Sequence, residues 1–183
     1  MAALSSVGLI DAVNGGNSVA NGLLGAFSAS AAGVTGAAIG TTSAPALYNP
    51  AGSGKVCKIT SIRFGDVSGT IIRANIRYYW AINQVPTGVT LGTIRSHSKG
   101  VPSVAQFLTA LTVGTAASVF LASGLGSGGA VAAQFYSLID RVEGDLTVLP
   151  GEIFYPYVSN GALAMVADVS MTWIEYAPPT GNI

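Results

Sequence analysis

The stretch of this sequence most like a cofactor-binding motif is the glycine-rich segment Gly124–Gly129. Its residues GLGSGG have the spacing G-x-G-x-x-G, follow the strand-like run Val119–Ala122 and precede a possible helix at 130–139. In dinucleotide-binding folds such a loop lets the backbone approach a pyrophosphate at the start of a helix. The rest of the chain does not alternate strands with helices, so we interpret the segment as a glycine-rich loop and predict no cofactor.

Two other places in the sequence have residue types that catalysis uses. The run NPAGSGK from Asn49 to Lys55 is like a phosphate-binding loop, but it lacks the first glycine and has Val56 where Ser or Thr is needed. We interpret it as a hinge. His97 is the only histidine, and its polar surroundings RSHSK indicate an exposed surface residue rather than a catalytic base. Since there is no G-x-S-x-G motif either, we predict that the protein is not an enzyme.

The acidic residues and the single cysteine do not match a metal site. Asp140, Glu143 and Asp145 cluster with Arg141 in a spacing unlike that of a calcium loop, which indicates a solvated and partly ion-paired loop. Cys57 has no second cysteine with which to form a disulfide or a structural zinc site. Its strand-like surroundings predict a small buried hydrophobe, and we predict no bound metal.

Basic and aromatic side chains share one face of the predicted strand 70–83. Arg73, Arg77 and Tyr79 form a stripe of the kind that binds single-stranded nucleic acid or a glycan. Two arginines are too few to drive such binding, and the formal net charge of zero argues against nucleic acid as a partner. We therefore expect the stripe to pair with an acidic residue such as Asp168 on a neighbouring strand, or to lie in a subunit interface.

The elements that position these residues are predicted from the alternation of apolar and polar side chains. Residues 55–67, 70–83 and 163–176 give the clearest strand patterns. Shorter strand candidates between Gly and Pro turns favour an all-β fold, an antiparallel β-sandwich. These candidates are 89–96, 104–113, 117–122, 131–141 and 145–149. Short helices at 103–111 and 130–141 are left open as alternatives, the second because of its alanine content.

The distribution of charge divides the chain at residue 54. The first 54 residues carry one charge, Asp11, and the other fifteen charged residues follow them. We predict an extended Gly/Ala-rich N-terminal arm and hinge over 1–54, and a β-sandwich domain over 55–183. An uncharged arm with few large side chains is most easily held on the surface of another protein. The apolar side chains expected to dock it there are Leu23, Leu24, Phe27 and Ile39.

The overall composition points to assembly. Charged residues make up 9% of the chain, against roughly 25% in ordinary soluble domains, and a free monomer of this kind would be poorly soluble. The uncharged stretch 22–40 is long enough to span a bilayer as a helix. However, much of it is Gly, Ser and Thr, and no basic residues flank it, so we predict no membrane partner.

Against this background the chain resembles virion structural proteins of tailed phages, namely capsid decoration or cement proteins and fibre subunits with a jelly-roll head. The resemblance rests on the uncharged arm and on LYNPAGSGK, ITSIRFGDVSGTIIRANIRYYW and LTVLPGEIFYPYVSNGALAMVADVSMTW, over roughly residues 47–177. In the last of these, a turn at Leu149–Glu152 leads into a strand, and a turn at Ser159–Gly161 precedes a long final strand.

The resemblance implies a structural protein of jelly-roll type that oligomerises as a homotrimer. It implies decoration or cementing of a phage capsid, with the N-terminal arm docked on the major capsid protein or another virion protein. The location expected from this is the virion, assembled in the host cytoplasm. The alternative is a fibre or spike head that binds a host receptor or glycan through loops such as 84–103.

Overall fold

The structure is a computed structural model that describes residues 23–35, 45–68, 76–82, 85–97, 100–112, 119–122, 137–158 and 166–177. These residues form eleven strands and no helix. The strands are β1 Leu23–Thr35, β2 Ala46–Asn49, β3 Val56–Ser68, β4 Ile76–Ile82, β5 Thr87–Leu91, β6 Ile94–Ser96, β7 Gln106–Thr112, β8 Val119–Ala122, β9 Ser137–Val148, β10 Glu152–Val158 and β11 Val166–Tyr176.

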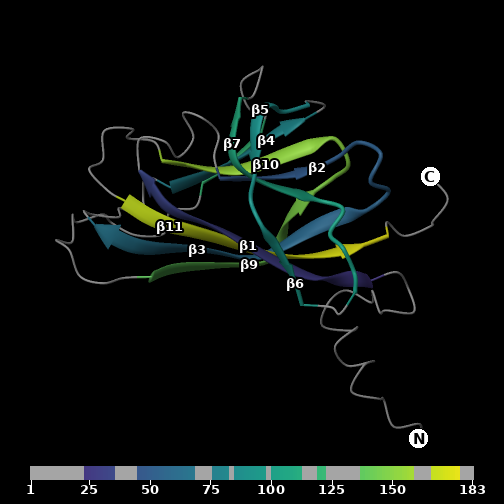
Figure 1. Ribbon diagram of the computed structural model, residues 1–183, viewed down its shortest axis with the longest axis horizontal. Coiled ribbons are helices and arrows are strands. Elements are labelled where there is room, and N and C mark those ends of the chain that lie inside the picture. The colour runs from purple at the N-terminus through teal and green to yellow at the C-terminus, as the bar shows by residue number, and fades with distance from the viewer. Residues whose placement is uncertain are drawn as a thin grey trace, which may run out of the picture.

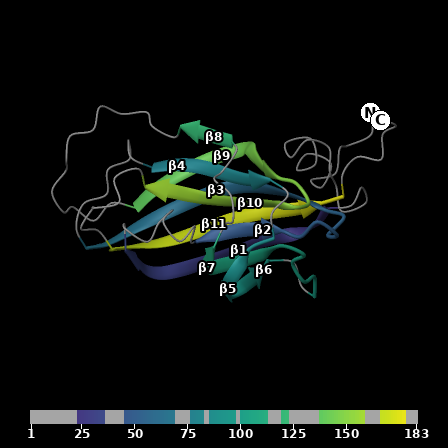
Figure 2. The same cartoon turned by 90° about the horizontal axis from the view of Figure 1, so that it is seen from above.

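The strands form two antiparallel sheets that pack face to face (Figure 1). One sheet has five strands in the order β6-β1-β11-β3-β9, and the other has six in the order β5-β7-β2-β10-β4-β8. Figure 2 shows the two sheets from above, with the long strands of both lying roughly along the same direction. The described part of the chain is therefore a β-sandwich, and the prediction of an all-β antiparallel fold is confirmed.

The order in which the strands pair is that of a jelly roll. Leaving out β5, β6 and β7, the first strand pairs with the last, β1 with β11, and the second with the second last, β2 with β10. The inner pairs follow the same rule, β3 with β9 and β4 with β8. This pattern results when one long antiparallel hairpin of eight strands is rolled over on itself.

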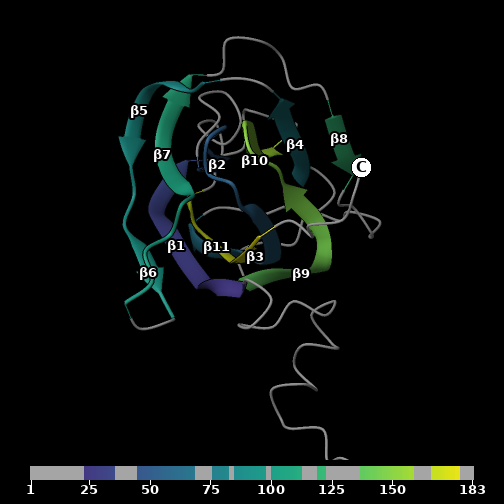
Figure 3. The ribbon, with the colours of Figure 1, turned by 90° about the vertical axis from the view of Figure 1, so that its right-hand side faces the viewer.

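The three remaining strands close one side of the sandwich. β7 and β5 continue the six-stranded sheet beyond β2, and β6 pairs with β1 in the other sheet, as Figure 3 shows from the end. The chain crosses between the sheets at Gly92, whose N–H donates to the carbonyl of Phe107 at 2.8 Å. A Cβ atom at Gly92 would lie 2.7 Å from Cδ1 of Phe107, so the crossing requires glycine.

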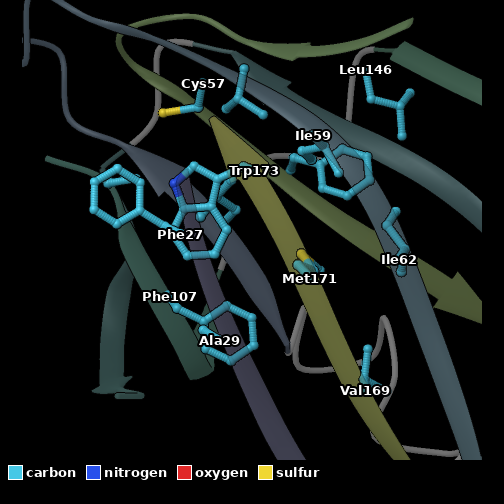
Figure 4. Packing of buried hydrophobic residues seen from close by; sticks show 14 of the residues in the cluster. Phe27, Ala29, Cys57, Ile59, Ile62, Phe107, Leu146, Val169, Met171 and Trp173 are labelled. Atoms are coloured by element: carbon cyan, nitrogen blue, oxygen red, sulfur yellow. The ribbon is translucent and has the colours of Figure 1, made fainter. Parts of the chain in front are cut away.

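The hydrophobic core lies between the sheets (Figure 4). Alternate residues of β11 point into it, ending with Trp173, whose ring packs on that of Phe27 with centroids 5.9 Å apart. Cys57 is fully buried in the same core, as the sequence predicted. The buried side chains that the core contains are Phe27, Ala29, Ala31, Leu47, Cys57, Ile59, Ile62, Phe64, Ala105, Phe107, Leu146, Val148, Phe154, Ala167, Val169, Met171 and Trp173.

The strand patterns read from the sequence agree with the structure where alternation is strong. β3, β4 and β11 fall within or close to the ranges predicted for the three clearest strands. The helix considered at 103–111 is wrong, because β7 occupies residues 106–112. The alternative helix at 130–141 is wrong for residues 137–141, which begin β9, and the predicted charged loop at Asp140–Asp145 is also part of that strand.

The N-terminal residues that the structure describes belong to the sandwich rather than to an arm. β1 lies between β6 and β11, and β2 lies between β7 and β10. Alternate residues of β1 face the core, so Phe27 is fully buried and cannot dock on another protein. For the inward residues of β1, the absence of charge reflects burial against other strands of the same chain. Residues 1–22 lie outside the described residues, where the arm stays a prediction.

Candidate functional site

The described surface has a groove on the outer face of the five-stranded sheet, with a volume of about 650 Å³. It lies over β1 and β11, between β6 on one side and β3 on the other. The groove is lined by Ser28, Ala29, Ser30, Arg63, Thr93, Arg95, His97, Ser170 and Thr172. Polar side chains thus dominate its lining, in contrast to the apolar side chains on the inner face of the same sheet.

Short hydroxyl side chains form the floor of the groove. Ser28 of β1 stands opposite Thr172 of β11, and Ser30 stands opposite Ser170 in the same ladder. These positions alternate with the core residues of both strands, so strand geometry turns them outward. Because all four side chains are short, the floor lies below the longer side chains on either side.

Two arginines stand on opposite sides of this floor. Arg95 of β6 is the register partner of Ser28, and Arg63 of β3 is the register partner of Ser170. Both arginines are exposed, and among the described residues neither forms an ion pair. β6 and β3 are separated by two strands, so the Cα positions of the arginines are roughly 14 Å apart across the sheet.

His97 fixes the side of the groove formed by β6. Its Nε2 atom is 2.9 Å from the Oγ atom of Ser28, and its backbone N–H donates to the carbonyl of Ala26 at 2.8 Å. The imidazole is exposed, as the sequence predicted. It therefore joins the end of β6 to the floor of the groove rather than standing alone on the surface.

A hydroxyl network fixes the floor on the other side. The Oγ1 atom of Thr172 lies 2.7 Å from Oγ of Ser61 and 2.9 Å from Oγ1 of Thr60. Thr60 also donates to the backbone carbonyl of Thr172 at 3.2 Å. These bonds hold the Thr172 side chain in place, and a ligand that reached the floor would meet an ordered surface.

The lining of the groove is cationic. Among the lining residues that the structure describes, the charged groups are the guanidinium groups of Arg63 and Arg95, and none is a carboxylate. Asp168 is exposed two residues before Ser170 on β11, and its Oδ1 atom accepts the N–H of Gly33 at 2.8 Å. Among the described residues, no three potential His, Cys, Asp or Glu ligands come together as a metal site would require. The chemistry offered is hydrogen-bond donation to an anionic and polar ligand.

A second polar group, Glu175, is fully buried at the end of β11 and holds a loop in place. Its carboxylate accepts the Oγ–H of Ser103 at 2.5 Å, the N–H of Val104 at 3.0 Å and the indole N–H of Trp173 at 3.1 Å. Burial raises the pKa of the Cys57 thiol, and the nearby charge of Glu175 raises it further. These are structural contacts within the core, since neither side chain reaches the surface.

The residues predicted for docking and interface that the structure describes are divided between the two sheets, on β1 and on β4. Leu23 and Leu24 begin β1, whereas Phe27 is in the core; Ile39 and Arg73 lie outside the described residues. Arg77 and Tyr79 are in β4 of the six-stranded sheet, where the Tyr79 ring stacks on that of Tyr155 at 5.9 Å. Pairing of Arg77 with Asp168 on a neighbouring strand is wrong, because β4 and β11 are in different sheets.

The two glycine-rich segments have different outcomes. Gly124–Gly129 lies outside the described residues. The hinge after β2 is an ordered turn, because the Nδ2 atom of the buried Asn49 donates to the carbonyls of Lys55 at 2.8 Å and Val148 at 2.9 Å.

The turn at Leu149–Glu152 does lead into a strand, β10, and Glu152 accepts the N–H of Leu149 at 2.8 Å.

The groove was missed at the level of sequence because its residues are scattered over β1, β3, β6 and β11. The one local signal is the alternation of Ser28 and Ser30 with core residues, matched by Ser170 and Thr172 near the other end of the chain. Nothing in the sequence indicates that these two segments are neighbours, because that depends on the pairing of the first and last strands.

In comparisons with protein-family models, with curated proteins and with solved structures, nothing matched the chain. Within the described residues there is also no helix of the length and apolarity needed to cross a membrane. Residues 23–35, where a membrane helix had been considered, form strand β1.

Proposed function

We propose that this chain is a structural subunit of a virion that assembles with copies of itself. The observation that carries the proposal is the surface of β5, one of the two edge strands of the six-stranded sheet. All five of its residues are exposed and none is charged. Three apolar side chains stand out along this edge, with exposed fractions of 77% for Val85, 43% for Val89 and 62% for Leu91.

An exposed edge of this kind favours contact with another protein. Sheet edges that must stay free usually carry charges, and exposed apolar side chains that lie together indicate an interaction site. Here the ladder from β5 to β7 is irregular at two points, and Gly88 has a positive φ of 60°. Because these bulges interrupt the edge, we expect the contact to use the apolar side chains rather than a continued sheet.

The fold and the composition are compatible with this assembly role. Jelly-roll sandwiches occur in viral capsids, although they also occur in lectins and cupins. The low charge of the chain suits surfaces that remain buried between subunits. The further expectation, docking on a capsid through residues before Leu23, concerns residues outside the described part and stays part of the proposal.

The first test is the mass of the full-length protein in solution by light scattering. We expect an oligomer, with a trimer as the specific expectation. The double variant Val89→Asp with Leu91→Asp should be monomeric, because each charge would be buried in the contact. The matched control is Val67→Asp, an exposed valine near the end of β3 on the other sheet, which should leave the mass unchanged.

A monomeric wild-type chain, or a double variant with the mass of the wild type, would contradict the assembly proposal. The virion part has a separate test, sedimentation of the protein with purified phage particles. Removal of residues 1–22, which leaves β1 intact, should abolish that sedimentation while the oligomer remains. Particles that retain the truncated protein would contradict docking through the N-terminal residues.

A further inference from the structure

We propose that the groove on the outer face of the five-stranded sheet is a binding site for an acidic oligosaccharide, one that carries carboxylate or sulfate groups. The site comprises the arginines on its two sides, Arg63 and Arg95, and the hydroxyl floor between them. The site does not require self-association, because all of its described lining residues belong to one chain.

The charge of the groove selects an anion. Arg63 and Arg95 are exposed, and within the part of the chain that the structure describes they make no ion pair and no carboxylate lines the groove. A guanidinium group binds carboxylate and sulfate oxygens through paired N–H donors, and such charge-assisted bonds are stronger than neutral ones. Since the arginines stand roughly 14 Å apart in Cα position across the sheet, a ligand that touches both must be longer than a single small ion.

The floor between the arginines selects a ligand with many hydroxyl groups. Ser28, Ser30, Ser170 and Thr172 each present a hydroxyl, which both donates and accepts hydrogen bonds. Sugar hydroxyls have the same property. Among the described residues, the side-chain hydroxyls of Ser30 and Ser170 form no hydrogen bond, so their bonding capacity is available to a ligand.

Other ligand classes fit this groove less well. Nucleic acid recognition uses aromatic platforms for the bases, and among the described lining residues the imidazole of His97 is the only aromatic ring. An extended peptide gains most of its affinity from backbone hydrogen bonds to a sheet edge. The floor is formed by β1 and β11, which are interior strands of the sheet with neighbours on both sides. They therefore offer no free edge to which a peptide backbone could bind.

The experiment is isothermal titration of the full-length protein at physiological salt with five probes. Chondroitin tetrasaccharide carries carboxylates, its sulfated form adds sulfates, and maltotetraose is a neutral saccharide of the same length. Inorganic sulfate and tetraglutamate test a small anion and an acidic peptide. We expect at least one of the two acidic tetrasaccharides to bind, and the other three probes to bind at least tenfold more weakly. Comparison of the two acidic forms identifies the anionic group recognised.

Variants then locate the binding on the protein. Arg63→Ala and Arg95→Ala should each weaken binding about tenfold to a hundredfold, because each removes a charge-assisted contact. Ser170→Leu should weaken it as strongly without any change of charge, since the larger side chain fills the floor. The matched control is Lys58→Ala, which removes a positive charge from β3 outside the groove and should leave affinity within about twofold.

Several results would overturn the proposal. These are the failure of both acidic tetrasaccharides to bind at millimolar concentration, equal binding of maltotetraose, sulfate or tetraglutamate, or unchanged affinity in both arginine variants. The Val89→Asp with Leu91→Asp variant separates this proposal from that of assembly. It should bind the oligosaccharide as the wild type does, whatever its oligomeric state, and a loss of binding there would place the site at a subunit contact instead.

Discussion

The two outer faces of the sandwich carry different kinds of side chain, although both are formed by strands of the same geometry. On the five-stranded sheet the outward residues of β1 and β11 include Ser28, Ser30, Ser170 and Thr172. On the six-stranded sheet the outward residues are apolar and buried within the single chain, namely Ala46, Tyr48, Leu108, Ile153 and Tyr155. Strands β2 and β10, in the middle of the six-stranded sheet, are therefore buried on both faces, whereas the five-stranded sheet is buried on one.

This difference shows which face is available for recognition. A sheet face that is already buried contributes stability but cannot meet a ligand, whereas a polar face costs little to leave in water. The groove and its two arginines lie on the polar face. The apolar side chains proposed for assembly lie at the edge of the other sheet, so the two proposed functions use separate parts of the surface.

The largest expected effect distinguishes the inner from the outer residues of β1. Phe27→Ala removes a fully buried ring from its contact with Trp173 and should lower the free energy of unfolding by about 3–5 kcal/mol. Its neighbour Ser28 faces the groove, so Ser28→Ala should cost less than about 1 kcal/mol. Urea unfolding measures both. Equal effects would mean that β1 is not part of the core and would restore the arm prediction.

A slightly smaller effect should separate the two outer faces themselves. Ile153→Ala, on the outer face of the six-stranded sheet, should cost about 2–5 kcal/mol because Ile153 is fully buried. Ser170→Ala, at an outward position of the other sheet, should change the free energy of unfolding by less than about 0.5 kcal/mol. Should Ile153→Ala be as mild as Ser170→Ala in urea unfolding, the contrast between the faces would be wrong.

The same contrast explains how much of the fold could be read from the sequence. β3 and β11 were predicted because their apolar residues alternate with charged or hydroxyl side chains, as a sheet buried on one face requires. β10 has no such alternation, because Ile153 to Pro156 are all buried. β1 was missed for another reason: its inward residues include Ala29 and Ala31, whose small side chains give a faint hydrophobic pattern.

The candidate site was harder to predict than the fold. Serine and threonine on an outward strand face are ordinary surface residues until their neighbours are known. The groove exists because β1 and β11, the first and last strands, are paired and are flanked by β3 and β6. Arg63 and Arg95 are 32 positions apart in the sequence, and only the pairing of four strands places them on two sides of one floor.

The smallest expected effect is a dependence of the free energy of unfolding on pH. It concerns the interior between the two sheets. Burial, and then the charge of Glu175, raise the pKa of the Cys57 thiol far above its ordinary value of 9.0. In the unfolded chain the thiol ionises above pH 9, whereas in the folded chain it stays protonated. Its contribution to stability is therefore complete below pH 9 and is lost above it, by about 1.4 kcal/mol at pH 10.

Cys57→Ala isolates this contribution. Urea unfolding between about pH 8 and 10 should show a steeper loss of stability in the wild type than in the variant. The phenol of Tyr176, whose pKa burial and Cys57 also raise, adds a loss of the same sign at higher pH that both proteins retain in part. Identical pH profiles would mean that the Cys57 thiol ionises as easily in the folded chain as in the unfolded one. Such a thiol would have to be in contact with water, and the interior between the two sheets would then not be closed at the end where Glu175 holds the loop before β7.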